Sequence, residues 1–471
     1  MTYKAPVAVN IRQATTSASV TDLNRSIFIA PHSYGTARQK SFSSLSELNA
    51  DTTIPKDSPA YIAISRALAG AGSRSLPIYL GRIEVTDIIL TPTLANSATY
   101  SFTVQVVDTT TYTDSVAAVE ISFTSDTDAT LTEITAGLDA ALTTAGITSS
   151  DIIVTDNGTD ITLLAAANRL IVTSELTENL VQTFDFTETA ATAFANIIAE
   201  DNDSWYYVTT AVRDIDWILD LADVIEATES SDNPKIFRVS SNAPATIVAQ
   251  TDPSAATDLL GLLDDADYKN TFGEWHDQAD EIYPELTSTV YYGSFFVGTQ
   301  NWAFMNNCPN PIARHPVLGR QLTTGEIGFI YDRNAAVRYN YMSVAIYGVG
   351  ENGDAPSQSA WMDNLSIAHW IRLTMKQRVF NTLVNAANGG LPLTFTAGDR
   401  AVIQERCESV LNEGVDRKML LGHTGVTVPD NISFSDQAAR TLQDVTFTGY
   451  YAGKINFVII DGILTYTEET A

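Results

Sequence analysis

Near its end the chain reads KINFVIIDGILTY, residues 454–466, and this stretch decides how the rest of the fold is interpreted. Its apolar side chains alternate from one side to the other, as they do in a β-strand. They are Ile455, Phe457 and Ile459 on one side and Val458 and Ile460 on the other. A strand that is apolar on both sides needs cover on both. Two interpretations remain open: the segment is the last strand of the protein's own sheet, or it completes the open sheet edge of a neighbouring subunit.

Both ends of the chain have the composition of extended arms. Ahead of the last stretch, Gly449 and Gly453 can act as joints, because glycine has no side chain to restrict its backbone. At the other end, residues 1–22 are polar, and Val7 and Val9 alternate as in a short strand. A frayed terminus has the same pattern. The sequence thus predicts an N-terminal arm and a hinged C-terminal arm.

Between the arms, strands and helices alternate in the manner of an α/β layer. Residues 26–30 and 76–80 are apolar enough for buried strands, and residues 58–69 between them have helical spacing. The same alternation resumes at Ser204. We therefore expect an α/β fold, α+β overall, with a split core domain made of residues 23–86 and 204–355.

Residues 87–203 interrupt this core with a segment rich in Thr, Asp and Val, in which Arg169 is the single basic residue. Helical spacing is found at 131–144, and residues 152–164 are a hairpin candidate with Asn157-Gly158 at the turn. We expect this segment to be an inserted β-rich domain that faces outward.

A C-terminal α+β domain is expected at residues 356–452, and the arm follows at 453–471. The strongest element of this domain is a helix at 360–387, whose apolar side chains lie on two sides, so that more than one partner should bury it. Three basic residues lie on the same helix: Arg372, Lys376 and Arg378. Either they meet carboxylates on a partner subunit or they form a solvated edge.

Composition and charge exclude several classes of protein. The 471 residues are 45% hydrophobic and 18% charged, as in globular proteins. A net charge of −29 disfavours direct nucleic-acid binding, because phosphates would be repelled. Two cysteines, Cys308 and Cys407, form no disulfide framework and favour a reducing compartment. We expect no membrane insertion and no signal peptide, so the protein should act where it is made or leave the cell by lysis.

No motif in the sequence indicates catalysis, so we expect neither an enzyme nor a cofactor or metal site. The histidines lack the HExxH spacing of zinc sites, and they are His32, His276, His315, His369 and His423. No phosphate-binding GxxxxGK[ST] and no GxSxG occurs. One GxGxxG is present at 348–353, but Glu351 within it would repel phosphate, and a loop is the expected structure.

Several stretches of the last third share a pattern of aromatic residues and glycines. They are WMDNLSIAHWIRLTMKQRVFN at 361–381, TAGDR at 396–400, LNEG at 411–414 and TGYYAGKINFVIIDG at 448–462. With them the sequence resembles the contractile tail sheath proteins of bacteriophages, and most of all a diverged branch formerly of unknown function. The resemblance covers most of residues 1–86 and 200–471. The loop at 389–392 departs from the better-known sheaths.

The resemblance implies a virion structural protein of the phage tail, assembled in the host cytoplasm. Sheath subunits form stacked hexameric rings around a tail tube, and their terminal arms pair with strands of neighbouring subunits. Contraction drives the tube through the host envelope. The implied partners are other copies of the chain, the tail tube protein, and the baseplate and tail terminator proteins. The arm residues would then be Val7, Val9, Ile455, Phe457, Ile459 and Ile460, with Gly449 and Gly453 as the hinge.

Two alternatives to this interpretation remain. One is a different multimeric tail or baseplate protein, although a tube protein would be smaller and mostly β. The other is a glycan-binding or hydrolytic tail protein with the acidic insert as its recognition domain. No sequence motif indicates either activity. If the chain is a sheath subunit, we expect the helix with Arg372, Lys376 and Arg378 to face the tube.

Overall fold

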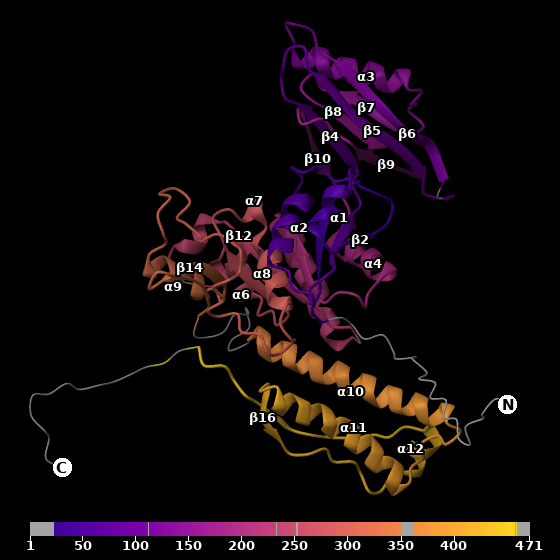
Figure 1. Cartoon of the computed structure of the whole chain (residues 1–471), viewed down its shortest axis with the longest axis vertical. Coiled ribbons are helices and arrows are strands. Elements are labelled where there is room, and N and C mark those ends of the chain that lie inside the picture. Colours follow the sequence, from indigo (N-terminus) through magenta and orange to yellow (C-terminus); the bar gives the residue numbers. More distant parts are fainter. Residues whose placement is uncertain are drawn as a thin grey trace, which may run out of the picture. The chain divides into compact units, whose positions relative to one another are not determined.

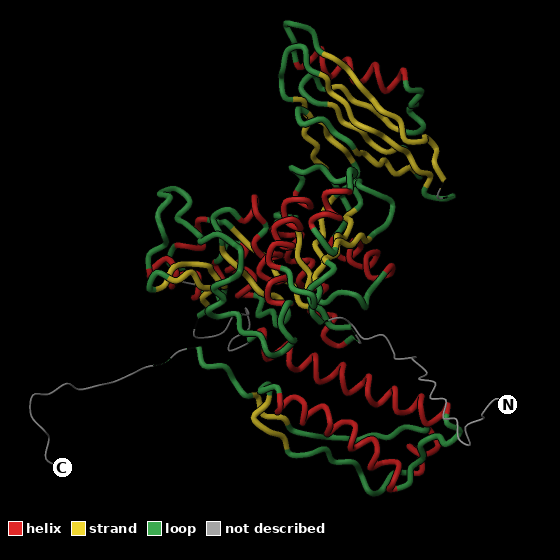
Figure 2. The backbone as a smooth tube through the Cα atoms, viewed as in Figure 1, coloured by secondary structure: helices red, strands yellow, loops and turns green. Residues whose placement is uncertain are grey.

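The computed structural model describes residues 23–111, 113–231, 233–250, 253–350, 361–456 and 458. Within them the chain forms two compact units (Figures 1 and 2). The smaller unit contains Ile371–Ala452, and the larger contains the described residues up to Trp370 and those from Gly453 on. The expected N-terminal arm at 1–22 lies outside the described residues, and so does residue 457 with 459–471.

A mixed sheet forms the centre of the larger unit. Among the described residues it has eight strands in the order β15-β14-β13-β12-β11-β1-β3-β2. The central pairs, from β14 to β3, are parallel, whereas the edge strands β15 and β2 pair antiparallel. The strands are β1 (Ser26–Pro31), β2 (Gln39–Phe42), β3 (Ile78–Ile83), β11 (Tyr207–Thr210), β12 (Ile236–Ser241), β13 (Thr271–Trp275), β14 (Ala336–Tyr341) and β15 (Val344–Gly348).

Helices cover both faces of this sheet. In β1, Ile27 and Ile29 enter one core, and Phe28 and Ala30 enter the other, because successive side chains of a strand point to opposite faces. The first core is closed by α4 (Ala190–Glu200), α5 (Ile215–Ala227), α6 (Leu259–Asp265) and α9 (Thr324–Tyr331). The second is closed by α1 (Leu45–Ala50), α2 (Pro59–Gly70) and α8 (Pro284–Gly293), and α7 (Ala279–Ile282) contacts α2. The α/β fold class expected from the sequence is confirmed.

The segment between β3 and α4 forms two further sheets around a core of its own. Among the described residues their strand orders are β10-β4-β8-β7 and β6-β5-β9. Figure 2 shows α3 (Leu131–Thr144) lying along these strands, and it packs on β4, β6 and β7. The strands are β4 (Asp87–Pro92), β5 (Thr99–Asp108), β6 (Thr113–Thr124), β7 (Ile152–Asp156), β8 (Ile161–Ala165), β9 (Arg169–Ser174) and β10 (Leu180–Asp185). The hairpin expected at Asn157-Gly158 is present as β7 and β8, and Gly158 has a φ of +76°.

One arginine ties together the two connections between this segment and the central sheet. The Arg38 guanidinium donates to the Glu84 carboxylate at 2.5 Å and to the Glu188 carboxylate at 2.8 Å. Glu188 also accepts from the backbone N–H of Glu84 at 2.6 Å. The entering and the leaving chain are therefore held side by side at the base of the segment.

The smaller unit consists of helices and a short hairpin. Its elements are the second part of α10 (Met362–Asn388), α11 (Ala397–Asp416), β16 (Leu420–His423), α12 (Phe434–Ala439) and β17 (Gly449–Tyr451). The helix expected at 360–387 is confirmed as α10. The division of the chain into two units falls within this helix, between Trp370 and Ile371. The domain boundaries expected at 23–86 plus 204–355, 87–203, 356–452 and 453–471 remain predictions.

The strand expected in residues 454–466 is not seen where the structure describes this stretch. Residues 453–456 and 458 have no regular secondary structure. The nearest strand, β17, ends at Tyr451 and pairs with β16 in the same unit. The first interpretation, a last strand of the protein's own sheet, therefore has no support in the described part of the arm.

A pair of glycine substitutions tests the packing of the larger unit. A Cβ on Gly293 would lie 2.2 Å from the backbone oxygen of Asn24, whose side chain also donates to the Gly293 carbonyl at 2.7 Å. We expect Gly293→Ala to lower the free energy of unfolding by roughly 2 kcal/mol or more, because backbone must move.

The matched control is Gly328→Ala in α9, where no atom lies within 4 Å of the added Cβ. There alanine should raise stability by about 0.5–1 kcal/mol through its helix propensity. Urea unfolding followed by tryptophan fluorescence measures both variants. Equal effects of the two substitutions would contradict the packing described at Gly293.

Candidate assembly surfaces

The hairpin of the smaller unit presents apolar side chains to solvent. β16 and β17 pair antiparallel, with Leu420 opposite Tyr451 and His423 opposite Gly449. No other strand joins this sheet among the described residues. Leu421 is 73% exposed and Tyr450 is 53% exposed. β16 packs on α11, and both edges of this two-stranded sheet lack a further strand among the described residues, so either edge could accept one.

The sequence did not reveal this hairpin, because its strands are short and far apart. Residues 424–448 separate β16 from β17, so no two-residue turn marks the pair. β16 reads Leu-Leu-Gly-His, which has no strand alternation. The one usable signal was the aromatic pair Tyr450-Tyr451 in β17.

The three basic residues expected to face a tube lie on the part of α10 that belongs to the smaller unit. Arg372 is half-buried and Lys376 is exposed. Arg378 donates to Ser409 at 2.9 Å and forms an ion pair with Glu413, both on α11. Its charge is thus already matched within the chain. A contact of these residues with a tube remains a prediction.

Glu413 on α11 forms ion pairs with both Arg378 and Arg417. Burial of the Glu413 carboxylate is outweighed by hydrogen bonds from Arg417 and Arg378, which hold its pKa below the usual value. The Arg417 Nε lies 2.9 Å from the carboxylate. Glu413 is therefore ionised at neutral pH and fixes α10 to α11.

The predicted arm residues are only partly within the described chain. Val7, Val9, Phe457, Ile459 and Ile460 lie outside it. Ile455 is described and is 79% exposed.

The two predicted hinge glycines differ in conformation. Gly449 is the first residue of β17 and pairs with His423. Gly453 has a φ of +58°, a backbone conformation that residue types other than glycine rarely adopt. Gly453 is also the point at which the chain returns to the larger unit. The hinge role of both glycines remains a prediction.

Just after Gly453, polar contacts hold the beginning of the arm on the larger unit. The Lys454 Nζ lies 2.5 Å from the Asp363 Oδ2 in the first turn of α10, and it donates to the Gly298 carbonyl at 3.3 Å. The Asn301 side chain donates to that of Asn456 at 3.2 Å. These contacts fix the position of residues 454–456.

The beginning of α10 is fixed to the same unit by a buried histidine. His369 is 1% exposed; its Nδ1 lies 2.6 Å from the Tyr206 hydroxyl, and its Nε2 lies 2.6 Å from the Glu229 carboxylate. Both ring nitrogens are satisfied within the protein, as a structural role requires.

Among the described residues, no group of three or more His, Cys, Asp or Glu side chains could hold a metal ion. Burial raises the pKa of the Cys308 thiol to about 11, so its reactive thiolate is scarce at neutral pH. No helix in the described ranges is long and apolar enough to cross a membrane.

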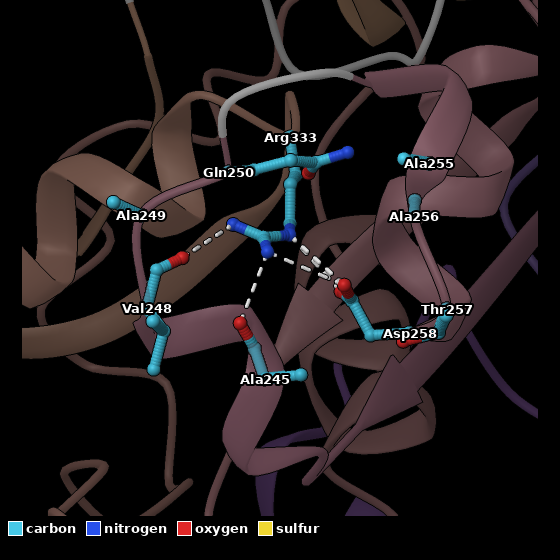
Figure 3. Close-up of a pocket in the computed structure, with 9 residues that line it drawn as sticks. All are labelled: Ala245, Val248, Ala249, Gln250, Ala255, Ala256, Thr257, Asp258 and Arg333. Carbon is cyan, nitrogen blue, oxygen red and sulfur yellow. Dashed lines mark hydrogen bonds and ion pairs between the residues drawn. The ribbon is translucent and has the colours of Figure 1, made fainter.

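A hollow of about 440 Å³ lies beside Arg333 (Figure 3). The Arg333 Nε lies 3.0 Å from the Asp258 carboxylate, and the other guanidinium nitrogens donate to the carbonyls of Ala245, Val248 and Phe329 and to Asp258. These contacts occupy all five N–H groups of the guanidinium. Arg333 therefore supports the surrounding loops and has no donor left for an anionic ligand.

Comparison with known proteins identifies the fold. No protein-family model matches the sequence, and no curated protein matches it significantly. A chain of the anti-feeding prophage baseplate is similar, with a TM-score of 0.54, 10% identity, and coverage of 98% of this chain and 100% of that chain. The anti-feeding prophage helical sheath in its contracted state has a TM-score of 0.51 at 10% identity, over 99% and 100% of the two chains. A sheath tail protein of Listeria innocua has a TM-score of 0.49 at 10% identity, over 94% and 98%. The chain thus has the fold of contractile sheath proteins, which confirms the resemblance noted in its sequence.

Replacement of His369 tests how α10 is attached. His369→Phe keeps an aromatic ring but removes the buried hydrogen bond with Tyr206 and the partly buried one with Glu229. We expect the free energy of local opening at residues 363–370 to fall by about 2–3 kcal/mol, measured by amide hydrogen exchange.

His423→Gln is the matched control, because His423 is partly exposed and bonds to Asn412 at 3.0 Å in the smaller unit. It should leave exchange at 363–370 unchanged. Equal protection of these residues in His369→Phe and the unmodified protein would show that His369 does not hold the helix.

Proposed function

We propose that the protein is a structural subunit of a contractile phage tail sheath. It polymerises as stacked rings around the tail tube and contracts to drive the tube through the host envelope. The observation that carries the proposal is the fold similarity to the contracted anti-feeding prophage sheath, which extends over 99% of this chain. Since a fold alone does not determine function, the surfaces of the chain must also suit assembly.

Two surfaces support polymerisation through exchanged strands. The β16–β17 hairpin belongs to a sheet that one or two further strands would extend, and Leu421 and Tyr450 lie exposed on it. The arm begins with an exposed apolar residue, Ile455. We propose that the arms of neighbouring copies, with Phe457, Ile459 and Ile460 at one end and Val7 and Val9 at the other, add strands to this hairpin.

The physics of such an assembly follows from its contacts. Head-to-tail contacts that do not close produce a helix, so one subunit type can build a tube of any length. Arms that stay paired let the compact parts of the subunits shift between two packings, and a kinetic barrier keeps the extended packing in place. The proposed partners are other copies, the tail tube protein, and the baseplate and terminator proteins.

In this proposal the chain acts in the virion tail and has no enzymatic role. The similar structures are named as sheath and baseplate components. The baseplate match favours one alternative, a subunit of the baseplate instead of the sheath. Electron microscopy of the purified protein separates the two, since a sheath subunit forms tubules or contracted cylinders and a baseplate subunit does not.

Removal of residues 453–471 tests strand exchange. Because residues 453–456 and 458 have no regular secondary structure and Ile455 and Val458 are exposed, we expect a folded monomer that no longer polymerises. Sedimentation velocity and electron microscopy measure the loss of assembly, and circular dichroism measures the fold. Tubes formed by the truncated chain would rule out the arm as the link.

Charge reversal on α10 tests the contact with the tube. Lys376→Glu should weaken tube attachment, because the exposed charge changes sign without the loss of the Arg378–Glu413 contact. Arg406→Glu, which changes an exposed arginine of α11, is the control and should leave attachment intact. Co-sedimentation with tubes measures both, and attachment unaffected by Lys376→Glu would place the tube contact elsewhere.

A further inference from the structure

The first residues of the arm alternate between bound and exposed side chains. Lys454 and Asn456 both bind the larger unit, whereas Ile455 between them is 79% exposed. Alternation with a period of two is the geometry of an extended chain. The contacts thus select which face of the arm turns toward its own subunit and which turns away.

The face that turns away carries Ile455 and is one of the two apolar sides of the predicted strand. It begins with Ile455, and the same alternation in the sequence continues to Phe457 and Ile459. Val458 shares the side of Lys454 and Asn456 and is 73% exposed, so among the described residues of the arm the contacts with the subunit reach as far as Asn456. Of these apolar side chains the structure describes Ile455 and Val458, and the arm's own subunit buries neither of them.

The contact at the centre of this arrangement is a partly covered ion pair. The Lys454 side chain is 22% exposed and that of Asp363 is 13% exposed. Asp363 lies in the first turn of α10, where the helix dipole favours a negative charge. Partial burial reduces solvent screening, so this pair is stronger than one on an open surface. The Gly298 carbonyl accepts a further bond from Lys454 at 3.3 Å.

We propose that Lys454 and Asp363 form an anchor that fixes where the C-terminal arm leaves the subunit and that presents its Ile455 face to a second copy of the chain. The inference rests on the proposed exchange of arms. Its physical basis is preorganisation: an arm with a fixed origin loses less conformational entropy when a neighbour captures it. Lys454 and Asp363 are positioning residues, and the second copy covers the apolar face.

Two single substitutions and their combination test the anchor. Lys454→Gln and Asp363→Asn remove one charge each with little change in shape. Each should raise the critical concentration for assembly by about 3- to 10-fold, since the arm must then be ordered on binding. The reversed pair, Lys454→Asp with Asp363→Lys, should recover most of the loss, which a merely structural role of either residue would not produce. Lys56→Gln, on an exposed lysine of the larger unit, is the control and should assemble like the unmodified chain.

A second measurement examines the anchor without assembly. Amide hydrogen exchange of residues 454–456 in the monomer should be at least several-fold faster in Lys454→Gln than in the unmodified chain. If the unmodified chain forms no polymer, the proposed function fails, and the exchange measurement still decides the anchor. The proposed anchor is wrong if amide hydrogen exchange of residues 454–456 is unchanged in Lys454→Gln. It is also wrong if the single variants assemble at the same critical concentration as the unmodified chain.

Discussion

Burial of apolar side chains on both faces of the eight-stranded sheet is the constraint on which the larger unit depends. Alternating side chains of β1 enter two cores, and the helices on each face close them. Burial on this scale fixes the sheet and, through His369, the beginning of α10. The smaller unit and the arm lack comparable cover. Leu421, Tyr450 and Ile455 are exposed in the isolated chain, and we propose that neighbouring copies cover them.

Electrostatics in this protein positions segments of the chain. Arg38 joins the two connections to the inserted segment, Arg333 supports the loops around Asp258, and Arg378 fixes α10 to α11 through Glu413. Lys454 does the same for the beginning of the arm. Each of these four cations has a carboxylate partner within the chain, and each of these ion pairs joins two segments.

The sequence allowed prediction of elements whose pattern is local. The buried strands, α10 and the hairpin at Asn157-Gly158 follow from periodicity and turn chemistry, and the α/β class follows from their order. The hairpin β16–β17 could not be found in this way, because its two short strands are separated by residues 424–448 and pair only through tertiary contacts. Likewise, the contact of Lys454 with Asp363 joins residues 91 positions apart, a pairing that no periodicity reveals.

The candidate assembly surface was predictable in part. Alternation in the sequence predicts Ile455 as an arm residue, and Ile455 lies exposed, whereas the charge of Arg378, which suggests a partner outside the chain, is matched by Glu413. In the proposed assembly the arm of one copy completes the hairpin sheet of another. A cryo-EM map of the assembled full-length protein, with the chain traced through residues 453–471, would show where the arm lies. We expect a tube in which this segment pairs with the β16–β17 hairpin of a neighbouring copy, and an arm folded back onto its own subunit in the assembled tube would rule out the exchange.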